Sequence, residues 1–248
     1  MAIPKPSASP EPPPLAPAPA LRVFLAEQRE DEAKPPFSRP KSRWLVVLVV
    51  LSVLSLAIDT ITIQSLQHLD LPGEVSKLVT YAEIFGHGVG VILLCLLAGL
   101  LDVRGMRVTG YLAVHAIGAG LIADGLKLFF TRLRPYHLLE PSAMDFAVKL
   151  PEFQWPTASV LTQAVRSFPS GHAATAAGLA IGLSRLYPKG TLLFALFAVL
   201  ASTQRVVAGA HYPSDCAVGI TCAFALSYML YYPLRVHERW LGPVTLKS

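Results

Sequence analysis

Charged residues are scarce in this chain of 248 residues. Lys, Arg, Asp and Glu make up 15% of the sequence, whereas 53% is hydrophobic and the mean hydropathy is +0.49. A typical soluble domain contains about 25% charged residues. The shortage of charge therefore excludes an ordinary soluble domain and indicates a protein that lies in a lipid bilayer.

Cysteine is also rare, and its spacing excludes the usual cysteine-based sites. Cys95, Cys216 and Cys222 form no CxxC pair and have no metal-ligand spacing with histidine. We therefore expect no zinc site, no disulfide, and no other metal or cofactor. The net charge of +5 comes without the basic, aromatic-interleaved surface typical of nucleic-acid binding, so nucleic acid is not an expected partner.

The sequence contains several long apolar stretches. A helix needs about 20 apolar residues to cross a bilayer, and unpaired backbone groups are costly in lipid. Six stretches approach that length: Trp44–Ile63, Tyr81–Leu101, Val108–Phe130, Gly171–Tyr187, Thr191–Val207 and Asp215–Tyr232. The predicted fold class is all-α, an integral membrane bundle of six transmembrane helices in residues 44–234. The short fourth and fifth spans, joined by Pro188–Gly190, leave a buried soluble hairpin as an alternative.

The segment before the first span has a composition of its own. Residues 1–43 contain 11 of the 21 prolines. Such a segment cannot bury enough apolar surface to fold, so we expect a disordered cytoplasmic tail, with a proline-rich ligand for an adaptor as the alternative. The tail is too long for the charged head of a cleavable signal, which predicts that the first span is retained. Residues 235–248 are expected to form a short cytoplasmic C-terminal tail.

Basic residues beside the spans predict the orientation. One side carries ten: Arg39, Lys41, Arg43, Arg104, Arg107, Arg185, Lys189, Arg235, Arg239 and Lys247. Apart from three basic residues discussed below, the other side carries Lys77, Arg132, Lys149 and Arg166. The ten-residue side should be cytoplasmic, with both termini inside. The Ala-, Pro- and Gly-rich composition favours a bacterial inner membrane.

Two polar segments stand at the ends of predicted spans. "KLFFTRLRP" places Lys127 at the end of the third span and Arg134 just beyond it. "PSGH" begins the fourth span, with Ser170 as a predicted N-cap and Gly171 allowing close backbone approach. A helix N-terminus suits a phosphate group, and His172 would lie within reach of it.

A third polar segment, "RVVAGAHYPSD", joins the fifth and sixth spans. Asp215 lies one turn from His211 and can accept the hydrogen of one ring nitrogen, which leaves the other nitrogen oriented and more basic. The alternative is a salt bridge between Arg205 and Asp215 with a bystander histidine. The predicted topology places all three segments on one membrane face, the outer one. Three cations meeting there would repel one another, and a bound phosphate would remove that repulsion.

Together the three segments resemble the signature of the type 2 phosphatidic acid phosphatase superfamily. They read Lys127-x6-Arg134-Pro135, Pro169-Ser170-Gly171-His172 and Arg205-x5-His211-x3-Asp215. The resemblance covers about residues 44–234 and implies a metal-independent phosphatase with a phosphohistidine intermediate. It implies that His211 is the nucleophile, Asp215 its orienting partner, His172 the general acid, and Lys127, Arg134, Ser170, Gly171 and Arg205 the phosphate-binding residues. The chain departs from the family at Gln204, where serine is usual.

A site at headgroup depth fits a lipid phosphate whose tail stays in the bilayer. Undecaprenyl diphosphate, phosphatidic acid and phosphatidylglycerol phosphate all remain candidate substrates, and the loop from Thr131 to Pro169 is expected to cover the site. A non-catalytic lipid-phosphate binder or transporter is one alternative, but binding alone needs no oriented nucleophile. A vanadate-dependent haloperoxidase is another, which six spans disfavour. The oligomeric state is left open.

Two smaller patterns concern the second and fourth spans. Glu83 and His87 are four residues apart and could share a helix face, in a role secondary to catalysis. The pairs Gly86-x3-Gly90 and Gly178-x3-Gly182 predict close helix packing within the bundle.

Overall fold

The computed structural model of the chain describes residues 42–66, 71–138, 166–231 and 240–241. Within these residues the fold is helical, and extended pairing is confined to one isolated bridge between Arg132 and Arg166. The elements are α2 (Ser42–Ser55), η1 (Leu56–Ile58), α3 (Asp59–Leu66), α4 (Gly73–Ala82), η2 (Glu83–Phe85), α5 (Gly88–Leu101), α6 (Met106–Leu126), α7 (Pro135–Leu138), α8 (Gly171–Leu186), η5 (Pro188–Gly190), α9 (Thr191–Val207) and α10 (Pro213–Tyr231). The predicted tails, residues 1–43 and 235–248, lie almost wholly outside the described residues.

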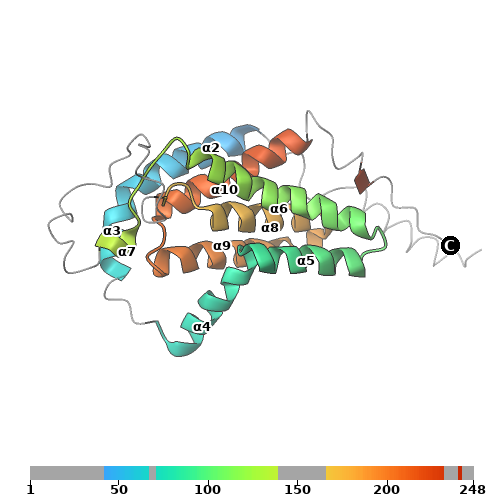
Figure 1. The fold of residues 1–248 in the computed structure, drawn as a ribbon, viewed down its shortest axis with the longest axis horizontal. Coiled ribbons are helices and arrows are strands. Elements are labelled where there is room, and N and C mark those ends of the chain that lie inside the picture. The colour runs from blue at the N-terminus through green and yellow to red at the C-terminus, as the bar shows by residue number, and fades with distance from the viewer. Residues whose placement is uncertain (1–41, 67–70, 139–165, 232–239, 242–248) are drawn as a thin grey trace, which may run out of the picture. The chain divides into compact units, whose positions relative to one another are not determined.

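Helix α8 forms the centre of the bundle. It packs against α6, α9 and α10, and ten of its 16 residues are buried (Figure 1). Most of the buried residues are alanine or glycine. Because apolar association contributes little between helices in lipid, close packing of small residues is the expected means of holding such a bundle together.

The two glycines of the fourth predicted span lie where α8 meets α6. A Cβ added at Gly178 would approach the backbone oxygen of His115 to 2.2 Å, and one at Gly182 would lie 2.9 Å from Leu112. At Gly86, an added Cβ would lie 2.7 Å from the backbone oxygen of His172. These glycines therefore allow helix contacts inside the bundle, as the sequence pattern predicts.

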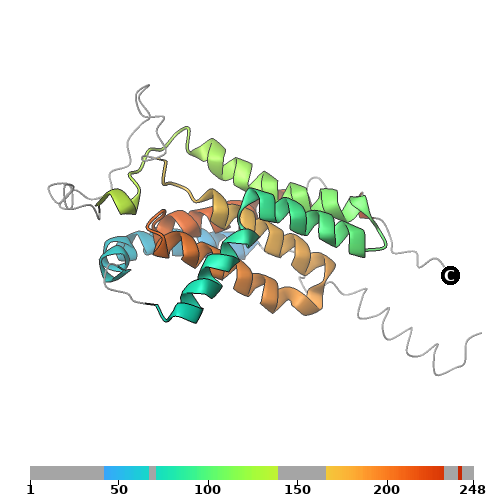
Figure 2. The same cartoon turned by 60° about the horizontal axis from the view of Figure 1, so that its bottom comes forward.

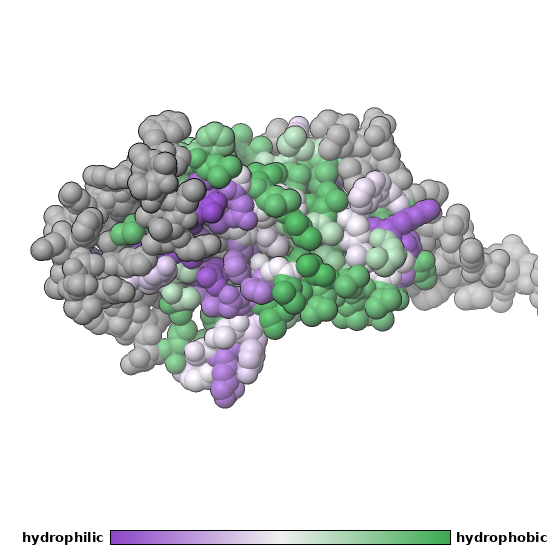
Figure 3. Space-filling model, viewed as in Figure 1, coloured by the Kyte–Doolittle hydropathy of each residue, from purple (hydrophilic) through white to green (hydrophobic). Residues whose placement is uncertain are grey.

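Apolar side chains cover the outer surface of the bundle. Large exposed hydrophobic residues are frequent on α2, α5 and α9, and Figure 3 shows a band of apolar residues between two polar ends. Four stretches are long and apolar enough to cross a membrane: Arg43–Ser65, Met106–Leu126, Pro188–Val207 and Pro213–Tyr231. They correspond to the first, third, fifth and sixth predicted spans. The 16 residues of α8, the fourth predicted span, are fewer than the roughly 20 of a usual crossing, but α8 is enclosed by its neighbours.

The second predicted span, Tyr81–Leu101, is not one straight helix but part of a bent pair of helical segments. The helical segments Gly73–Phe85 and Gly88–Leu101 meet at an angle of 70°. The chain tightens into the 3₁₀ turn η2, and the backbone of His87 is extended, which interrupts the helical hydrogen bonds. Helix α4 consequently leaves the line of α5 and packs on α9 (Figures 1 and 2).

Several segment ends meet at one end of the bundle. Figure 1 shows α3 and α7 beside the start of α10 and the end of α9, and the end of α6 and the start of α8 face the same way. The start of α2 and the end of α10 lie toward the opposite end. The three polar segments identified in the sequence therefore share one end of the fold, as the predicted topology requires.

We expect Gly178→Ala to destabilise the protein, because the added methyl would meet a backbone oxygen that cannot move without shifting α6. Overpacking of this kind costs about 1–3 kcal/mol. Gly125→Ala, also at a helical glycine but with nothing within 4 Å of the added Cβ, should be neutral or slightly stabilising. Thermal unfolding of both variants in detergent checks this, and equal melting temperatures would contradict the packing assigned to Gly178.

Candidate active site

The turn between α9 and α10 places His211 next to Asp215. Gly209 has φ of +65°, a left-handed conformation that glycine adopts without strain, and the amides of Ala210 and His211 both donate to the carbonyl of Arg205. His211 Nδ1 then lies 3.5 Å from Asp215 Oδ2, an ion-pair distance. Both side chains are buried, and His211 Nδ1 has no hydrogen-bond partner among the described residues. Catalytic hydrogen bonds are often this long before substrate binds.

The start of α8 is fixed to the start of α10. Ser170 is the N-cap of α8, as predicted: its Oγ accepts from the amide of Ala173 at 3.4 Å. The amide of Ser170 donates to the carbonyl of Asp215 at 3.0 Å. A Cβ at Gly219 would lie 2.4 Å from the carbonyl oxygen of Ser170, so glycine is required for this approach. The second and third polar segments therefore join through backbone contacts.

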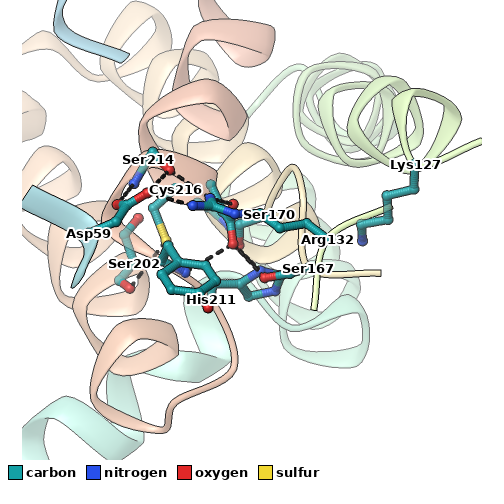
Figure 4. A network of polar contacts seen from close by, with 12 residues as sticks. Asp59, Lys127, Arg132, Ser167, Ser170, Ser202, His211, Ser214 and Cys216 are labelled. Carbon is teal, nitrogen blue, oxygen red and sulfur yellow. Dashed lines mark hydrogen bonds and ion pairs between the residues drawn. The ribbon is translucent and has the colours of Figure 1, made fainter. Parts of the chain in front are cut away.

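Lys127 and Arg134 approach the same region from the first polar segment. Lys127 follows the last residue of α6 and pairs with Asp124 at 2.7 Å, and a Cβ built on Gly171 would lie 3.6 Å from Lys127 Nζ. Figure 4 shows Lys127 at the edge of the polar network that surrounds His211. Arg134 is half-buried, and its charge acts on His211. Lys127 therefore lies beside the start of α8, and Arg134 is close enough to His211 for its charge to act there.

Arg205 lies on the last turn of α9 and contacts two side chains. Its Nη1 donates to Glu83 Oε1 at 2.5 Å and to Gln204 Oε1 at 3.2 Å. Gln204, which replaces the usual serine of the family pattern, thus accepts a hydrogen bond from the arginine next to it. Glu83 Oε1 also lies 3.7 Å from His172 Nε2. Glu83 and His87 both lie near His172, since the His87 and His172 ring centroids are 5.9 Å apart, although the helix breaks between Glu83 and His87.

A buried ion network supports Asp215 from behind. Arg132 Nη1 lies 2.5 Å from Asp215 Oδ1, and Arg132 Nη2 lies 2.7 Å from Asp59 Oδ2 (Figure 4). Ser214 accepts from Arg132 and donates to Asp59 through both its amide and its hydroxyl. Ser167 Oγ donates to Asp215 Oδ2 at 2.5 Å. The network therefore fixes the carboxylate that faces His211.

Further contacts complete the surroundings of Asp215 and Arg132. The amide of Tyr212 donates to Asp215 Oδ2 at 2.9 Å, and the Arg132 guanidinium lies 3.9 Å from the centroid of the Tyr212 ring. A planar guanidinium is well suited to stack on an aromatic ring while its edge binds carboxylates. Four of the protein's segments, those carrying Asp59, Arg132, Ser167 and Asp215, are thereby joined at one point.

Burial decides the protonation of His211. It lowers the pKa of the His211 imidazole, and the charges of Arg134 and Lys127 act in the same direction, whereas the Asp215 carboxylate opposes the shift without reversing it. The imidazole is therefore neutral near pH 7 and keeps a lone pair. Among the described residues, no three His, Cys, Asp or Glu side chains are grouped so that they could hold a metal ion.

The sequence-based prediction missed the supporting residues. Asp59 is an acidic residue inside an apolar stretch, which in a membrane protein is itself a sign of a buried role. In the sequence, Arg132 looks like one more basic residue beside a span. In the structure it is buried, with 2% of its surface exposed. Nothing in the sequence marks Ser167 and Ser214 as supporting residues, apart from their positions close to the second and third polar segments. By contrast, the structure brings together all eight residues that the sequence identified.

We predict that Arg132→Met destabilises the protein more than Asp59→Asn. The first change leaves two buried carboxylates without their shared cation, whereas the second leaves the pair between Arg132 and Asp215. Breaking a buried pair costs about 3–5 kcal/mol. Lys77→Met, which removes an exposed pair with Glu74, is the control and should cost about 1 kcal/mol or less. Thermal unfolding in detergent gives the order; similar losses for Arg132→Met and Lys77→Met would contradict it.

Parts of this chain resemble known proteins. Lipid A 1-phosphatases of Rhizobium johnstonii and Rhizobium etli are 33% and 32% identical to the chain over 110 residues. These alignments cover 44% of this chain and 41% and 43% of the relatives, so the chain matches less than half of their length. A crystal structure of a transmembrane PAP2 type phosphatidylglycerolphosphate phosphatase from Bacillus subtilis covers 81% of this chain and 98% of its own, with 17% identity and a TM-score of 0.48.

A family model supplies the assignment. The model of the PAP2 superfamily matches residues 108–237, just over half of the chain. The matched region contains all three polar segments and the helices that carry them. This chain therefore belongs to the PAP2 superfamily.

Proposed function

We propose that this protein hydrolyses a phosphate ester or diphosphate of a membrane lipid through a phosphohistidine on His211. The observation that carries the proposal is the pair of His211 and Asp215, buried at 3.5 Å from each other beside the start of α8 and three cationic side chains. The superfamily and the two lipid phosphatases with partial matches support the same class of reaction.

His211 is the nucleophile in this proposal. Nδ1 faces Asp215, so Nε2 is the nitrogen left for attack on phosphorus. As the nitrogen–phosphorus bond forms, the imidazole becomes cationic, and the Asp215 carboxylate stabilises the developing charge. The buried contacts from Ser167, Tyr212 and Arg132 keep that carboxylate from turning away.

The phosphate-binding residues are Lys127, Arg134, Ser170, Gly171 and Arg205. Lys127 and the first residues of α8 lie on one side, where helix amides and a partial positive charge favour an anion. Arg134 and Arg205 add charge from two other segments. Fixed positive charge around the equatorial oxygens of a transferring phosphoryl group stabilises the transition state.

His172 completes the scheme as the general acid. Its proton passes to the leaving oxygen of the lipid as the phosphorus–oxygen bond breaks. In the second step the neutral His172 takes a proton from water while that water's oxygen attacks phosphorus, which releases phosphate and restores His211 and His172. A polar bundle end next to an apolar surface fits a substrate whose tail stays in lipid (Figure 3).

Phosphorylated lipids at headgroup depth are the proposed substrate class. The named relatives act on lipid A, so lipid A 1-phosphate joins polyprenyl diphosphate, phosphatidic acid and phosphatidylglycerol phosphate in the set to be tested. We further propose that the site faces the outer side of a bacterial inner membrane, with both tails cytoplasmic. The excess of Lys and Arg on the side of the termini supports this orientation.

The decisive experiment compares wild type with His211→Gln in detergent, using radiolabelled members of this lipid set in the presence of a chelator. Wild type should release phosphate and, after an acid-free quench, carry a base-stable, acid-labile phosphoryl label. His211→Gln should lose both, with release reduced by at least about 10³-fold, since the covalent route is removed. Equal release by the two proteins would rule out the nucleophile, and release that needs an added divalent metal would rule out the metal-independent scheme.

The pH dependence follows from the lowered pKa of His211. We expect the His211 imidazole to stay neutral below its usual pKa of about 6.5, so the acidic limb of kcat/KM should lie below that value. Arg134→Gln removes a nearby positive charge and should raise the pKa of His211 relative to wild type. Imidazole NMR titration of both proteins, with the His211 signal assigned from His211→Gln, measures the shift. An unchanged or lower pKa in Arg134→Gln would contradict the assigned charge contact.

A further inference from the structure

Glu83 occupies the bend between α4 and α5 and points at two residues of the proposed site. Its Oε1 accepts from Arg205 Nη1 at 2.5 Å and lies 3.7 Å from His172 Nε2. The Glu83 side chain is 29% exposed and that of His172 is 31% exposed. One carboxylate oxygen therefore lies between a phosphate-binding arginine and the general acid.

Burial disfavours a proton on His172, and the charged and titratable groups that add to this effect are basic. Lys127 acts from the end of α6, Arg205 from α9, His211 from the turn before α10, and His87 from the start of α5. The His87 and His172 ring centroids are 5.9 Å apart. Asp124, the nearest acid on α6, is paired with Lys127. Cationic neighbours oppose a proton on an imidazole, so an acid in this position needs an anion beside it.

We propose that Glu83 is a positioning residue that keeps the proton on His172 and aligns Arg205 for phosphate. The inference rests on the proposed function, because it concerns the acid step of that mechanism. The carboxylate favours the imidazolium form of His172 before the lipid oxygen leaves. His172 then gives its proton to that oxygen.

The second half of the role concerns the guanidinium. Glu83 and Gln204 both bind Nη1 of Arg205, while Arg205 Nε has no partner among the described residues. Nε and Nη2 thus form the edge available to a phosphate oxygen. Because Nη1 is already held, the Arg205 side chain would lose less conformational freedom when Nε and Nη2 bind an anion. The broken helix makes this possible, since a straight second span could not bring Glu83 between α8 and α9.

The test separates proton donation from every other role by changing the leaving group. An alkyl phosphate lipid needs a proton on its departing oxygen, whereas an analogue with the same tail and a nitrophenyl leaving group does not. Glu83→Gln should lower kcat for the alkyl substrate by about tenfold or more, and kcat for the nitrophenyl substrate by less than about threefold. His172→Ala is the reference for lost acid catalysis and should show the same pattern more strongly.

Glu74→Gln is the matched control, since Glu74 belongs to the neighbouring helix α4 and pairs only with exposed Lys77. It should leave both rates unchanged. Glu83→Asp keeps the charge with a shorter reach and should recover part of the alkyl rate, which excludes a folding defect as the cause. Melting temperatures accompany each rate.

The outcomes distinguish this inference from the proposed function. If His172→Ala shows the leaving-group pattern and Glu83→Gln reduces both rates equally or not at all, Glu83 does not keep the proton on His172, and the proposed function stands. If His172→Ala shows no dependence on the leaving group, the acid assignment fails, and the role of Glu83 fails with it.

Discussion

The side chain of Arg132, held between Asp59 and Asp215, is the contact on which the rest of the site depends. A guanidinium can bind two carboxylates through separate nitrogens, and here each carboxylate comes from a different helix. The three groups carry one net negative charge in a buried place, which is costly unless further donors or a cation compensate. Ser167, Ser214 and the Tyr212 amide supply donors. His211, next to Asp215, is the group that can take up positive charge when the proposed reaction begins.

Small residues explain how so many polar groups reach one place. Because α8 is rich in alanine and glycine, α6 and α10 pack closely against it, and its first turn lies against the start of α10. A bulkier central helix would hold the amide of Ser170 away from the carbonyl of Asp215. Packing inside the bundle therefore decides the spacing of groups at its end.

Much of this arrangement could be predicted from the sequence. Apolar runs predict six spans, four of which match stretches long and apolar enough to cross a membrane. Counting six crossings places Lys127, His172 and His211 at one end, because segment ends alternate between two sides. The N-cap at Ser170 and the one-turn spacing of His211 and Asp215 follow from local geometry. The structure places these groups as expected, while their chemical roles stay predictions.

The bend in the second span and the partners of Arg132 could not be predicted, because the hydropathy of a segment does not say which way its helix runs or what its side chains contact. The run from Tyr81 to Leu101 is continuous in composition, but a 3₁₀ turn and the extended backbone of His87 bend it by 70°. At this bend Glu83 binds Arg205, and both Glu83 and His87 lie near His172. Arg132 looks like any basic residue beside a span until its two carboxylate partners, 73 and 83 residues away, are known.

Two carboxylates lie beside the two histidines of the proposed site, Asp215 at His211 and Glu83 at His172. Asp215 is buried behind His211, so in the proposed reaction its charge would stabilise His211 without meeting the phosphate. Glu83 is partly exposed and paired with Arg205, so its charge is largely offset where phosphate would bind. If both carboxylates stood behind His211, His172 would face only cations. With one carboxylate at each histidine, the proposed mechanism has a neutral His211 for attack and a protonated His172 for donation. When water enters, His172 would take a proton and His211 would be the leaving group.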